Sequence, residues 1–414
     1  MRTDVITKLT TAQRDRACGA LLGLAAADTQ ETGRWSDHTA TAVAVAEIAA
    51  TGAKLHDSAQ HERIAQRWHW WAQTVKGEAL QHVSLAASVP VALAYLHDEA
   101  RLAAAARAIA GLIDDDPATG DAWALWADAV RHAVLTGEFN IRVGTAQLDQ
   151  HQGALWAARF AEAEHTPPSA FDHSSAIGAV QGAWSAIARV SAPADRYPLF
   201  PADHLRLVLE AGAGAAAGGL LGAVHGASAV PFDQRLALHG WPGLRSRDVI
   251  GLAERIVGDG DRVSYFRTED QPYPNRHPHD DGVFIGGVGP LARPSQYVPD
   301  DVDAIVSLCP IVGSWIPAGT IHLDVRLAED ENPNLDFVLL DTVRAVEHLR
   351  GIGRTVFLHG LHGHSRTPAV AALYGARRAG IGIGRALRDV GLVLPGADPS
   401  AEFQAALHRI AGAV

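Results

Sequence analysis

A short loop near residue 360 carries the residue types that bind phosphate. The chain from residue 355 to 378 reads TVFLHGLHGHSRTPAVAALYGARR. Thr355–Leu358 is typical of a strand and Thr367–Gly380 of a helix, so the residues between them enter a helix N-terminus. Backbone N–H groups at such a position, together with an arginine fork, can hold phosphate or sulfate. The sequence therefore predicts an anion-binding loop with these residues: Gly360, Gly363, Ser365, Arg366 and Thr367.

This loop resembles the signature of the cysteine-dependent phosphatases, H-C-x-x-x-x-x-R-[ST]. His359, Arg366 and Thr367 stand at matching positions, whereas Gly360 stands where the signature has cysteine. Without a thiolate no phosphocysteine intermediate can form. We therefore expect that the chain is not a cysteine-dependent phosphatase, although the binding part of the loop can remain.

The resemblance extends from Val283 to the end of the chain, which is similar to a dual-specificity phosphatase domain. It includes three further stretches: Asp303–Ile311, Glu331–Gly360 and His364–Arg378. The resemblance implies a small α/β domain and a general acid on a mobile loop before the cysteine position. Three carboxylates lie in that region: Glu329, Asp330 and Glu331. The nearby histidines are not expected to replace the nucleophile, because attack in this fold comes from the loop floor, which Gly360 leaves empty.

A second group of chemistry-bearing side chains lies near the N-terminus. Its members are Asp28, Glu31, Trp35, Asp37 and His38, of which Glu31 and Trp35 are candidate ligand-binding residues. An aspartate beside a histidine can act as an acid–base pair without a metal, which makes Asp28, Asp37 and His38 candidate catalytic residues. In the alternative interpretation, Ser36 and Asp37 cap the helix that begins near Thr39, and His38 is solvated in its first turn.

The segment around these residues, Arg16–Ala50, resembles the opening of the ADP-ribosylglycohydrolase family. Members begin with a G-A-L-L-G-L-A-x-G-D-A helix followed by a T-D-D-T motif. Further stretches also fit the family: Pro90–Leu96, Ala118–Glu138, Val180–Ala188, Gly218–Pro231 and Leu238–Val249. The resemblance covers about residues 1–258. It implies an all-α domain that hydrolyses ADP-ribosyl bonds with two magnesium ions held by Thr/Asp clusters.

The metal-binding motifs of that family are altered in this chain. The T-D-D-T motif reads Ser36-Asp37-His38-Thr39, and the G-D-A-L-G motif keeps only Asp28. The second cluster, D-x-D-T, falls on residues 209–212 and leaves Glu210 as a single carboxylate. Magnesium needs several oxygen ligands in near-octahedral order. We therefore expect no metal, no other cofactor and no metal-assisted glycosidic cleavage.

The residues around these motifs predict two domains and a connection. Residues 1–258 are expected to form the all-α domain, residues 259–282 a Pro- and Asp-rich linker, and residues 283–414 the α/β domain. Within that linker, His277–Asp281 is expected to be a solvated loop. The clearest predicted helices are Thr39–Thr51, His61–Thr74, Glu99–Leu112, Asp121–Leu135, Ala176–Val190 and Leu205–Gly226 in the first domain.

In the second domain, strands are expected to alternate with helices around a mainly parallel sheet. The predicted strands are Val283–Ile285, Ala304–Leu308, Gly319–Leu323 and Thr355–Leu358. The predicted helices are Phe337–Arg350 and Thr367–Gly380.

Charge and composition exclude some classes of binding partner. A net charge of −11 argues against a nucleic-acid surface and against an anionic membrane. The N-terminus has no apolar core of signal-peptide length, so a cytoplasmic location is expected. Cys18 and Cys309 lie far apart in apolar contexts and are expected to be buried free thiols.

These observations leave three functional hypotheses. In the first, both parental hydrolase activities are lost, and the chain binds a phosphorylated or ADP-ribose-like small molecule or a protein partner. In the second, the glycohydrolase cleft has been repurposed for metal-independent acid–base chemistry in specialised metabolism, using the Asp/His set. In the third, residual ADP-ribosyl hydrolysis remains.

Overall fold

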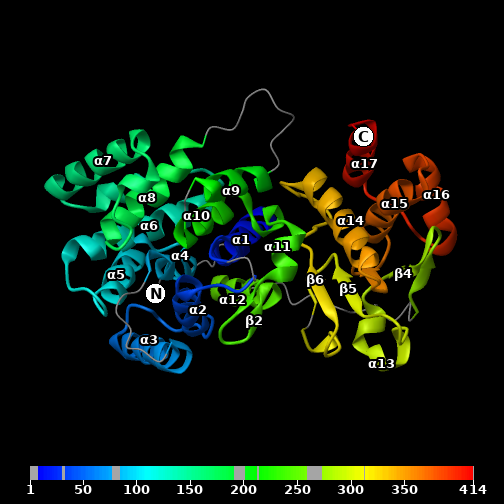
Figure 1. The fold of residues 1–414 in the computed structure, drawn as a ribbon, viewed down its shortest axis with the longest axis horizontal. Helices are drawn as coiled ribbons and strands as arrows, with labels where there is room; N and C mark the ends of the chain where they lie inside the picture. Colours follow the sequence, from blue (N-terminus) through cyan, green and yellow to red (C-terminus); the bar gives the residue numbers. More distant parts are fainter. Residues whose placement is uncertain are drawn as a thin grey trace, which may run out of the picture. The chain divides into compact units, whose positions relative to one another are not determined.

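The computed structural model describes residues 8–29, 33–76, 84–190, 201–211, 214–258, 273–311 and 313–413. The chain forms two compact units. The helical unit comprises residues 1–230 and 237–260, and the sheet unit comprises residues 231–236 and 261–414. The predicted fold class, a helical part followed by a small α/β part, is confirmed (Figure 1).

The boundaries differ from the predicted ones in two places. Residues 231–236, most of helix α11 (Phe232–Ala237), belong to the sheet unit although they lie within the predicted all-α domain. Strand β3 (Asn275–His277) and the start of strand β4 (Asp280–Gly286) lie inside the predicted linker. Residues 259–272 of that linker lie outside the described residues.

The helical unit is built from helices and one short hairpin. Its helices are α1 (Thr11–Ala27), α2 (Asp37–Ala49), α3 (Ser58–Trp71), α4 (Val89–Ala94), α5 (Glu99–Ala110), α6 (Pro117–Thr136), α7 (Gln150–His165), α8 (Ala176–Arg189), α9 (Pro201–Glu210), α10 (Ala215–His225) and α12 (Ser246–Val257). The hairpin pairs β1 (His239–Gly240) with β2 (Leu244–Arg245). Local signals set the helix ends, as in α6: Asp116 caps its first turn, Pro117 follows, and Gly137 ends it with φ of 79°.

Helices α1 and α10 pack with their backbones in contact through four glycines. A Cβ atom on Gly19 would collide with the Gly222 carbonyl, and one on Gly23 would collide with the Gly218 carbonyl. Substitution of Gly222 would likewise push into the backbone of Gly19. The glycines of this Ala/Gly-rich sequence therefore allow close helix approach, which brings the first and tenth helices together at the core.

The predicted helix Leu205–Gly226 is two helices. Helix α9 ends at Glu210, and α10 begins at Ala215 after the N-cap Gly214. Glycine loses more conformational freedom than other residues on entering a helix, so Gly214 favours a break here.

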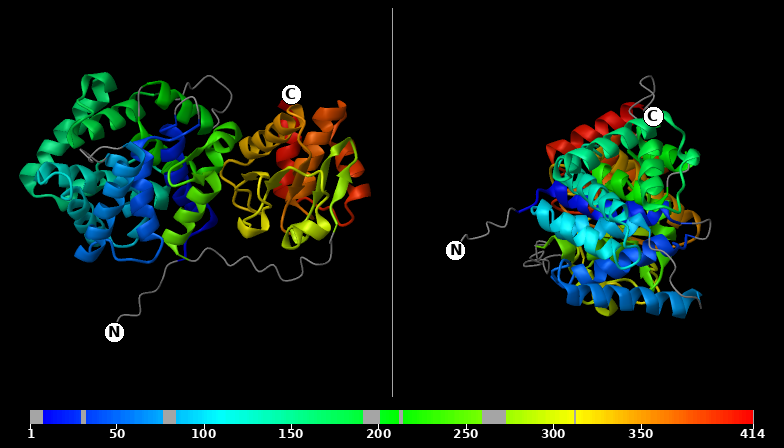
Figure 2. Two further views of the ribbon diagram at one scale, coloured as in Figure 1. Left: turned by 60° about the horizontal axis from the view of Figure 1, so that its bottom comes forward. Right: turned by 90° about the vertical axis from the view of Figure 1, so that its left-hand side faces the viewer.

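The sheet unit contains a five-stranded sheet in the order β3-β4-β7-β5-β6. Its remaining strands are β5 (Ala304–Ser307), β6 (Ile321–Asp324) and β7 (Val356–His359). All neighbours are parallel except β3 and β4, so the predicted mainly parallel sheet is confirmed. Besides most of α11, its helices are α13 (Pro294–Tyr297), α14 (Leu335–Gly351), α15 (Arg366–Ala379), α16 (Ile383–Val393) and α17 (Ala401–Ala413), seen beside the strands in Figures 1 and 2.

The sheet is buried on both faces, as expected for parallel strands. On one face Phe284, Ile305 and Phe357 lie in register and pack with Val288 and Leu291 from the segment after β4. The alternate residues of these strands are also buried. Strand β7 is therefore central, and the loop that leaves its carboxyl end starts from a rigid position.

Two further sequence expectations can be compared with the described residues. Cys18 and Cys309 are buried free thiols, which confirms their prediction. Among the described helices, none is long and apolar enough to cross a membrane.

Candidate functional site

In the loop between β7 and α15, carbonyl groups accept hydrogen bonds from other segments, whereas most of the backbone N–H groups have no described acceptor. The Leu361 carbonyl accepts from the Val288 N–H at 3.2 Å, and the His364 carbonyl accepts from the Asp398 N–H at 2.7 Å. The N–H groups of residues 361–366 donate to no acceptor within the described parts of the chain. Successive free amides before a helix N-terminus are the arrangement that attracts an anion.

The loop requires glycine at one of its two glycine positions near Arg366 and not at the other. Gly363 has φ of 75°, and a Cβ there would lie 3.0 Å from the backbone of residues 286 and 287. Only glycine fits this close approach. Gly360 has no such constraint: a Cβ there would meet the Thr367 Oγ1 at 3.0 Å and otherwise make ordinary contacts. The nucleophile position therefore accepts a Cβ atom if the Thr367 hydroxyl moves by a few tenths of an ångström.

Ser365 and Thr367 hold the loop rather than face an open site. The Ser365 hydroxyl accepts from the Ser400 N–H at 3.2 Å, which ties the loop to the start of α17. The Thr367 hydroxyl donates to the Gly286 carbonyl at 3.0 Å, which ties it to the end of β4. The ligand-binding role predicted for these two side chains stays a prediction, because their visible contacts are internal.

Arg366 is the first residue of α15 and is buried. Its Nη1 donates to the carbonyls of Leu308 at 3.0 Å and Leu327 at 3.1 Å. Its Nε lies 2.7 Å from a Glu329 carboxylate oxygen, but the Nε–H makes no hydrogen bond, so this contact is an ion pair with poor alignment. The Nη2 has no partner among the described residues. The Nε and Nη2 donors, which share one edge of the guanidinium, are thus incompletely satisfied.

A buried hydrogen-bond relay supports the loop from below. Burial lowers the pKa of His359 to about 4, so its ring is neutral at pH 7. Its Nδ1 lies 3.2 Å from the Gly360 carbonyl and must carry the proton, which leaves Nε2 as an acceptor. The Ser307 hydroxyl therefore donates to His359 Nε2 at 2.7 Å, and His322 Nε2–H donates to Ser307 at 2.9 Å. The relay fixes the carbonyl of Gly360.

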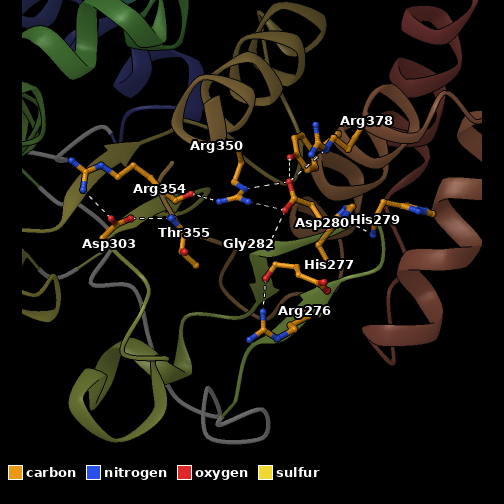
Figure 3. A network of polar contacts seen from close by, with 12 residues as sticks. Arg276, His277, His279, Asp280, Gly282, Asp303, Arg350, Arg354, Thr355 and Arg378 are labelled. Atoms are coloured by element: carbon orange, nitrogen blue, oxygen red, sulfur yellow. Dashed lines mark hydrogen bonds and ion pairs between the residues drawn. The ribbon is translucent and has the colours of Figure 1, made fainter. Parts of the chain in front are cut away.

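The prediction of a solvated loop at His277–Asp281 is wrong. His277 is 2% and Asp280 is 9% exposed, because β3 and β4 form a hairpin there and pack on α15. Figure 3 shows Asp280 between Arg350 and Arg378, and it also accepts from the Tyr374 hydroxyl at 2.6 Å. Burial raises the pKa of Asp280, but hydrogen bonds from Tyr374, Arg350 and Gly282 outweigh it and hold the pKa below its usual value. The segment is a structural network of the sheet unit.

In the helical unit, Asp28 caps the following helix. One of its oxygens accepts from the Ser36 N–H at 3.0 Å and the Thr39 N–H at 2.9 Å, and the other accepts from the Ser36 hydroxyl at 2.6 Å. Asp28 thus satisfies free N–H groups at the start of α2 from the end of α1. Both oxygens of this candidate catalytic residue are engaged.

The other N-terminal candidates are not assembled around Asp28. Trp35 is buried, donates its indole N–H to the Trp241 carbonyl and covers Gly240, so its contacts are those of packing. Asp37 is half-buried and His38 is exposed, and no hydrogen bond or ion pair joins His38 to either aspartate in the described chain. Glu31 lies outside the described residues. The acid–base set stays a prediction without geometric support.

The residues at the two expected metal positions do not fit a dimagnesium centre. Both carboxylate oxygens of Asp28 accept hydrogen bonds, from three donors in all. Glu210 is exposed and forms an ion pair with Arg206 at 2.6 Å. Over the described ranges, no cluster of three or more His, Cys, Asp or Glu side chains could hold a metal ion. Hard cations need several free oxygen ligands, and this donor set does not supply them.

Sequence reasoning missed three functional contacts. Glu329 was one of three candidates for a general acid, and its ion pair with Arg366 was not predicted. Ser307 and His322 lie on β5 and β6, and only sheet register brings them beneath Gly360. The capping role of Asp28 depends on a turn that returns Ser36 and Thr39 to it.

Comparisons with known proteins find the two kinds of relative that the motifs resemble. No family model matches the chain. The chain is 23% identical over 122 residues to dual specificity protein phosphatase 1 of Arabidopsis thaliana, covering 30% of this chain and 62% of that protein. It therefore spans less than two thirds of that relative.

Solved structures match the chain in two ways. Human DUSP28 is 23% identical, covers 34% of this chain and 93% of its own, and has a TM-score of 0.31. Human tyrosine phosphatase-like serine/threonine/tyrosine-interacting protein is 18% identical, with coverages of 34% and 95% and a TM-score of 0.30. An ADP-ribosylglycohydrolase-related protein complex is 19% identical, covers 60% of this chain and 99% of its own, and has a TM-score of 0.43.

Proposed function

We propose that the sheet unit binds a phosphate monoester in the 360–367 loop without cleaving it through a covalent enzyme intermediate. The observation that carries the proposal is the row of N–H groups at residues 361–366 that donate to no described residue, beside the incompletely satisfied guanidinium of Arg366. Amides and arginine together match the charge and the several acceptor oxygens of a phosphate group. Gly360 supplies no nucleophile at the floor of this loop.

The buried thiol and histidine near the loop are unsuited to replace the missing cysteine. Burial raises the pKa of Cys309 to about 12, so it is protonated at neutral pH and is a weak nucleophile. His359 is fully buried, and its two ring nitrogens are engaged by Gly360 and Ser307. Binding is therefore the function that the loop chemistry favours.

For the helical unit we propose a scaffold role with no metal-assisted hydrolysis. Asp28 caps α2, and the acid–base alternative is disfavoured because both Asp28 oxygens are occupied and His38 is not joined to it. The ligand of the sheet unit is proposed to be a small phosphorylated molecule or a phosphorylated protein, and neither nucleic acid nor membrane is proposed as a partner.

The test is a calorimetric titration of the whole protein with phenyl phosphate. We expect saturable binding in the wild type and at least about tenfold weaker binding in Arg366→Lys, which keeps the charge but loses the fork. Arg377→Lys is the matched control, because Arg377 pairs with Glu347 on the exposed side of the same helix. Equal binding by wild type and Arg366→Lys, or release of phosphate by the wild type, would contradict the proposal.

A further inference from the structure

We propose that Glu329 is an internal competitor for the phosphate site: its carboxylate lies at the Nε donor of Arg366 and must leave before a phosphate can bind both the Nε and the Nη2 donors. This inference rests on the proposed function. It assigns a regulatory contact to one of three neighbouring carboxylates that the sequence could not separate.

The contacts of Arg366 show which edge is taken. Nη1 is fixed by the carbonyls of Leu308 and Leu327, so the guanidinium cannot turn away from its place. One edge remains for an anion, and its two donors are the Nε–H and the Nη2–H. Glu329 lies 2.7 Å from Nε, while Nη2 has no described partner. A bidentate phosphate needs parallel N–H donors, so it competes directly with Glu329.

The alignment of this ion pair indicates that it can be displaced. The Nε–H makes no hydrogen bond even at that short separation, whereas a well-directed phosphate oxygen would accept one. The Glu329 side chain is 50% exposed, so water replaces its partner at little cost when it leaves. Because water reaches the carboxylate, the pair contributes about 1 kcal/mol, the upper end of the range for surface pairs.

The segment that carries Glu329 is preformed. Two hydrogen bonds between Asn332 and Ala328 close this segment. The Asn332 side-chain oxygen accepts from the Ala328 N–H at 2.8 Å, and the Asn332 side-chain amide donates to the Ala328 carbonyl at 3.1 Å. Glu331 is a non-glycine residue with φ of 57° in the same turn. The turn is therefore specified by its own residues, and release of Glu329 requires a side-chain movement without unfolding of the turn.

The neighbouring Asp330 provides a matched control. It is exposed, carries the same charge and makes no ion pair in the described part of the protein. The change Asp330→Asn removes a negative charge near the site without touching Arg366. The change Glu329→Gln removes the competitor and keeps the side-chain length.

The experiment titrates the whole protein with phenyl phosphate by calorimetry for wild type, Glu329→Gln and Asp330→Asn. We expect Glu329→Gln to bind about two- to fivefold more tightly than wild type, the factor that corresponds to the loss of such a pair. Asp330→Asn is expected to stay within about 1.5-fold of wild type, since it alters only screened long-range charge. Unfolding curves of the three proteins verify that each is folded.

The other outcomes separate failure of this inference from failure of the proposed function. If wild type binds but Glu329→Gln binds equally or more weakly, Glu329 positions Arg366 and does not compete, which overturns this inference alone. If both variants gain equally, the effect is general charge and the inference again fails. If neither the wild type nor any variant, Arg366→Lys included, binds phenyl phosphate, both the proposed function and this inference are wrong.

Discussion

Arg235 and Asp341 form an ion pair that is buried inside the sheet unit, with 2% and 4% of their side chains exposed and 3.0 Å between Nη2 and a carboxylate oxygen. Arg235 comes from the 231–236 segment and Asp341 from α14. The same Asp341 oxygen accepts from the Phe232 N–H at 3.0 Å, and Arg235 Nη1 donates to the Asp324 carbonyl at 2.9 Å. A segment distant in sequence is thereby part of the core of this unit.

Removing one member of this pair should destabilise the sheet unit strongly. Burial raises the pKa of Asp341 despite the opposing effect of Arg235, so an unpaired carboxylate there is costly. We expect Arg235→Ala to lower the free energy of unfolding by about 3–5 kcal/mol. Urea unfolding followed by circular dichroism measures the effect. Arg377→Ala is the control, because its pair with Glu347 is about a third exposed and contributes about 1 kcal/mol or less. Equal losses in the two variants would contradict the assignment.

Restoring the missing side chain should restore some of the missing chemistry. We expect Gly360→Cys to release nitrophenolate from p-nitrophenyl phosphate at a rate above wild type, because the loop amides and Arg366 are in place and the only tight neighbour is the Thr367 hydroxyl. Gly360→Ala adds the same Cβ atom without a thiol and should stay inactive. A variant with cysteine that matches the alanine variant would show that the loop no longer supports phosphoryl transfer.

Stability should depend on pH through His359. The folded pKa is about 4 and the ordinary value is 6.5, so between these values the unfolded chain binds more protons than the folded chain. The contribution is therefore full above about pH 6.5 and is lost as pH falls toward 4, and it amounts to about 3 kcal/mol. Thermal melts across this range should show a shallower slope for His359→Gln than for wild type. His362→Gln is the control, because His362 is exposed, and an unchanged slope in His359→Gln would refute the assignment.

Close packing of α1 on α10 should make the central glycines intolerant of a methyl group. Gly222→Ala is expected to lower the free energy of unfolding of the helical unit by about 1–3 kcal/mol or more, because the added carbon meets fixed backbone. Gly391→Ala lies in α16 with nothing within 4 Å and should stabilise by up to about 1 kcal/mol. Chemical unfolding of both variants compares them. A harmless Gly222→Ala would mean that the helices can separate without cost.

The capping role of Asp28 can be separated from a metal role. Asp28→Ala should lower the free energy of unfolding by about 1–3 kcal/mol, since the buried Thr39 N–H and the Ser36 groups lose their acceptor. Asp57→Ala should lower the free energy of unfolding by only a few tenths of a kcal/mol, because the Asp57 side chain makes no capping hydrogen bond at the start of α3. Magnesium should leave the wild-type melting midpoint unchanged. A magnesium-dependent rise that disappears in Asp28→Ala would instead establish a metal site.

The sequence predicted those features that depend on local pattern. Apolar periodicity located α2, α5 and α14, and short β-branched runs located β5 and β7. Features that depend on distant pairing were missed. His277 and Asp280 look like a polar loop until β3 pairs with β4 and α15 covers them, and the break between α9 and α10 was hidden in an Ala/Gly run.

The same distinction applies to the site. Gly360, Gly363 and Arg366 could be identified because a loop between a strand and a helix is contiguous in sequence. The roles of Glu329 and Asp28 could not be assigned, because each is decided by atoms that the fold brings from another segment: the Arg366 guanidinium in one case and the Thr39 amide in the other. Tertiary placement therefore decided which carboxylates compete, cap or remain solvated.

The backbone at Gly360 has a consequence for how such a loop evolves. Its conformation does not require glycine, and the space around a Cβ is limited only by one hydroxyl. Two of the four glycine codons differ from a cysteine codon by a single base, and a Cβ atom at this position asks only that the Thr367 hydroxyl shift slightly. Backbone conformation alone therefore does not explain why glycine stands where a nucleophile would be.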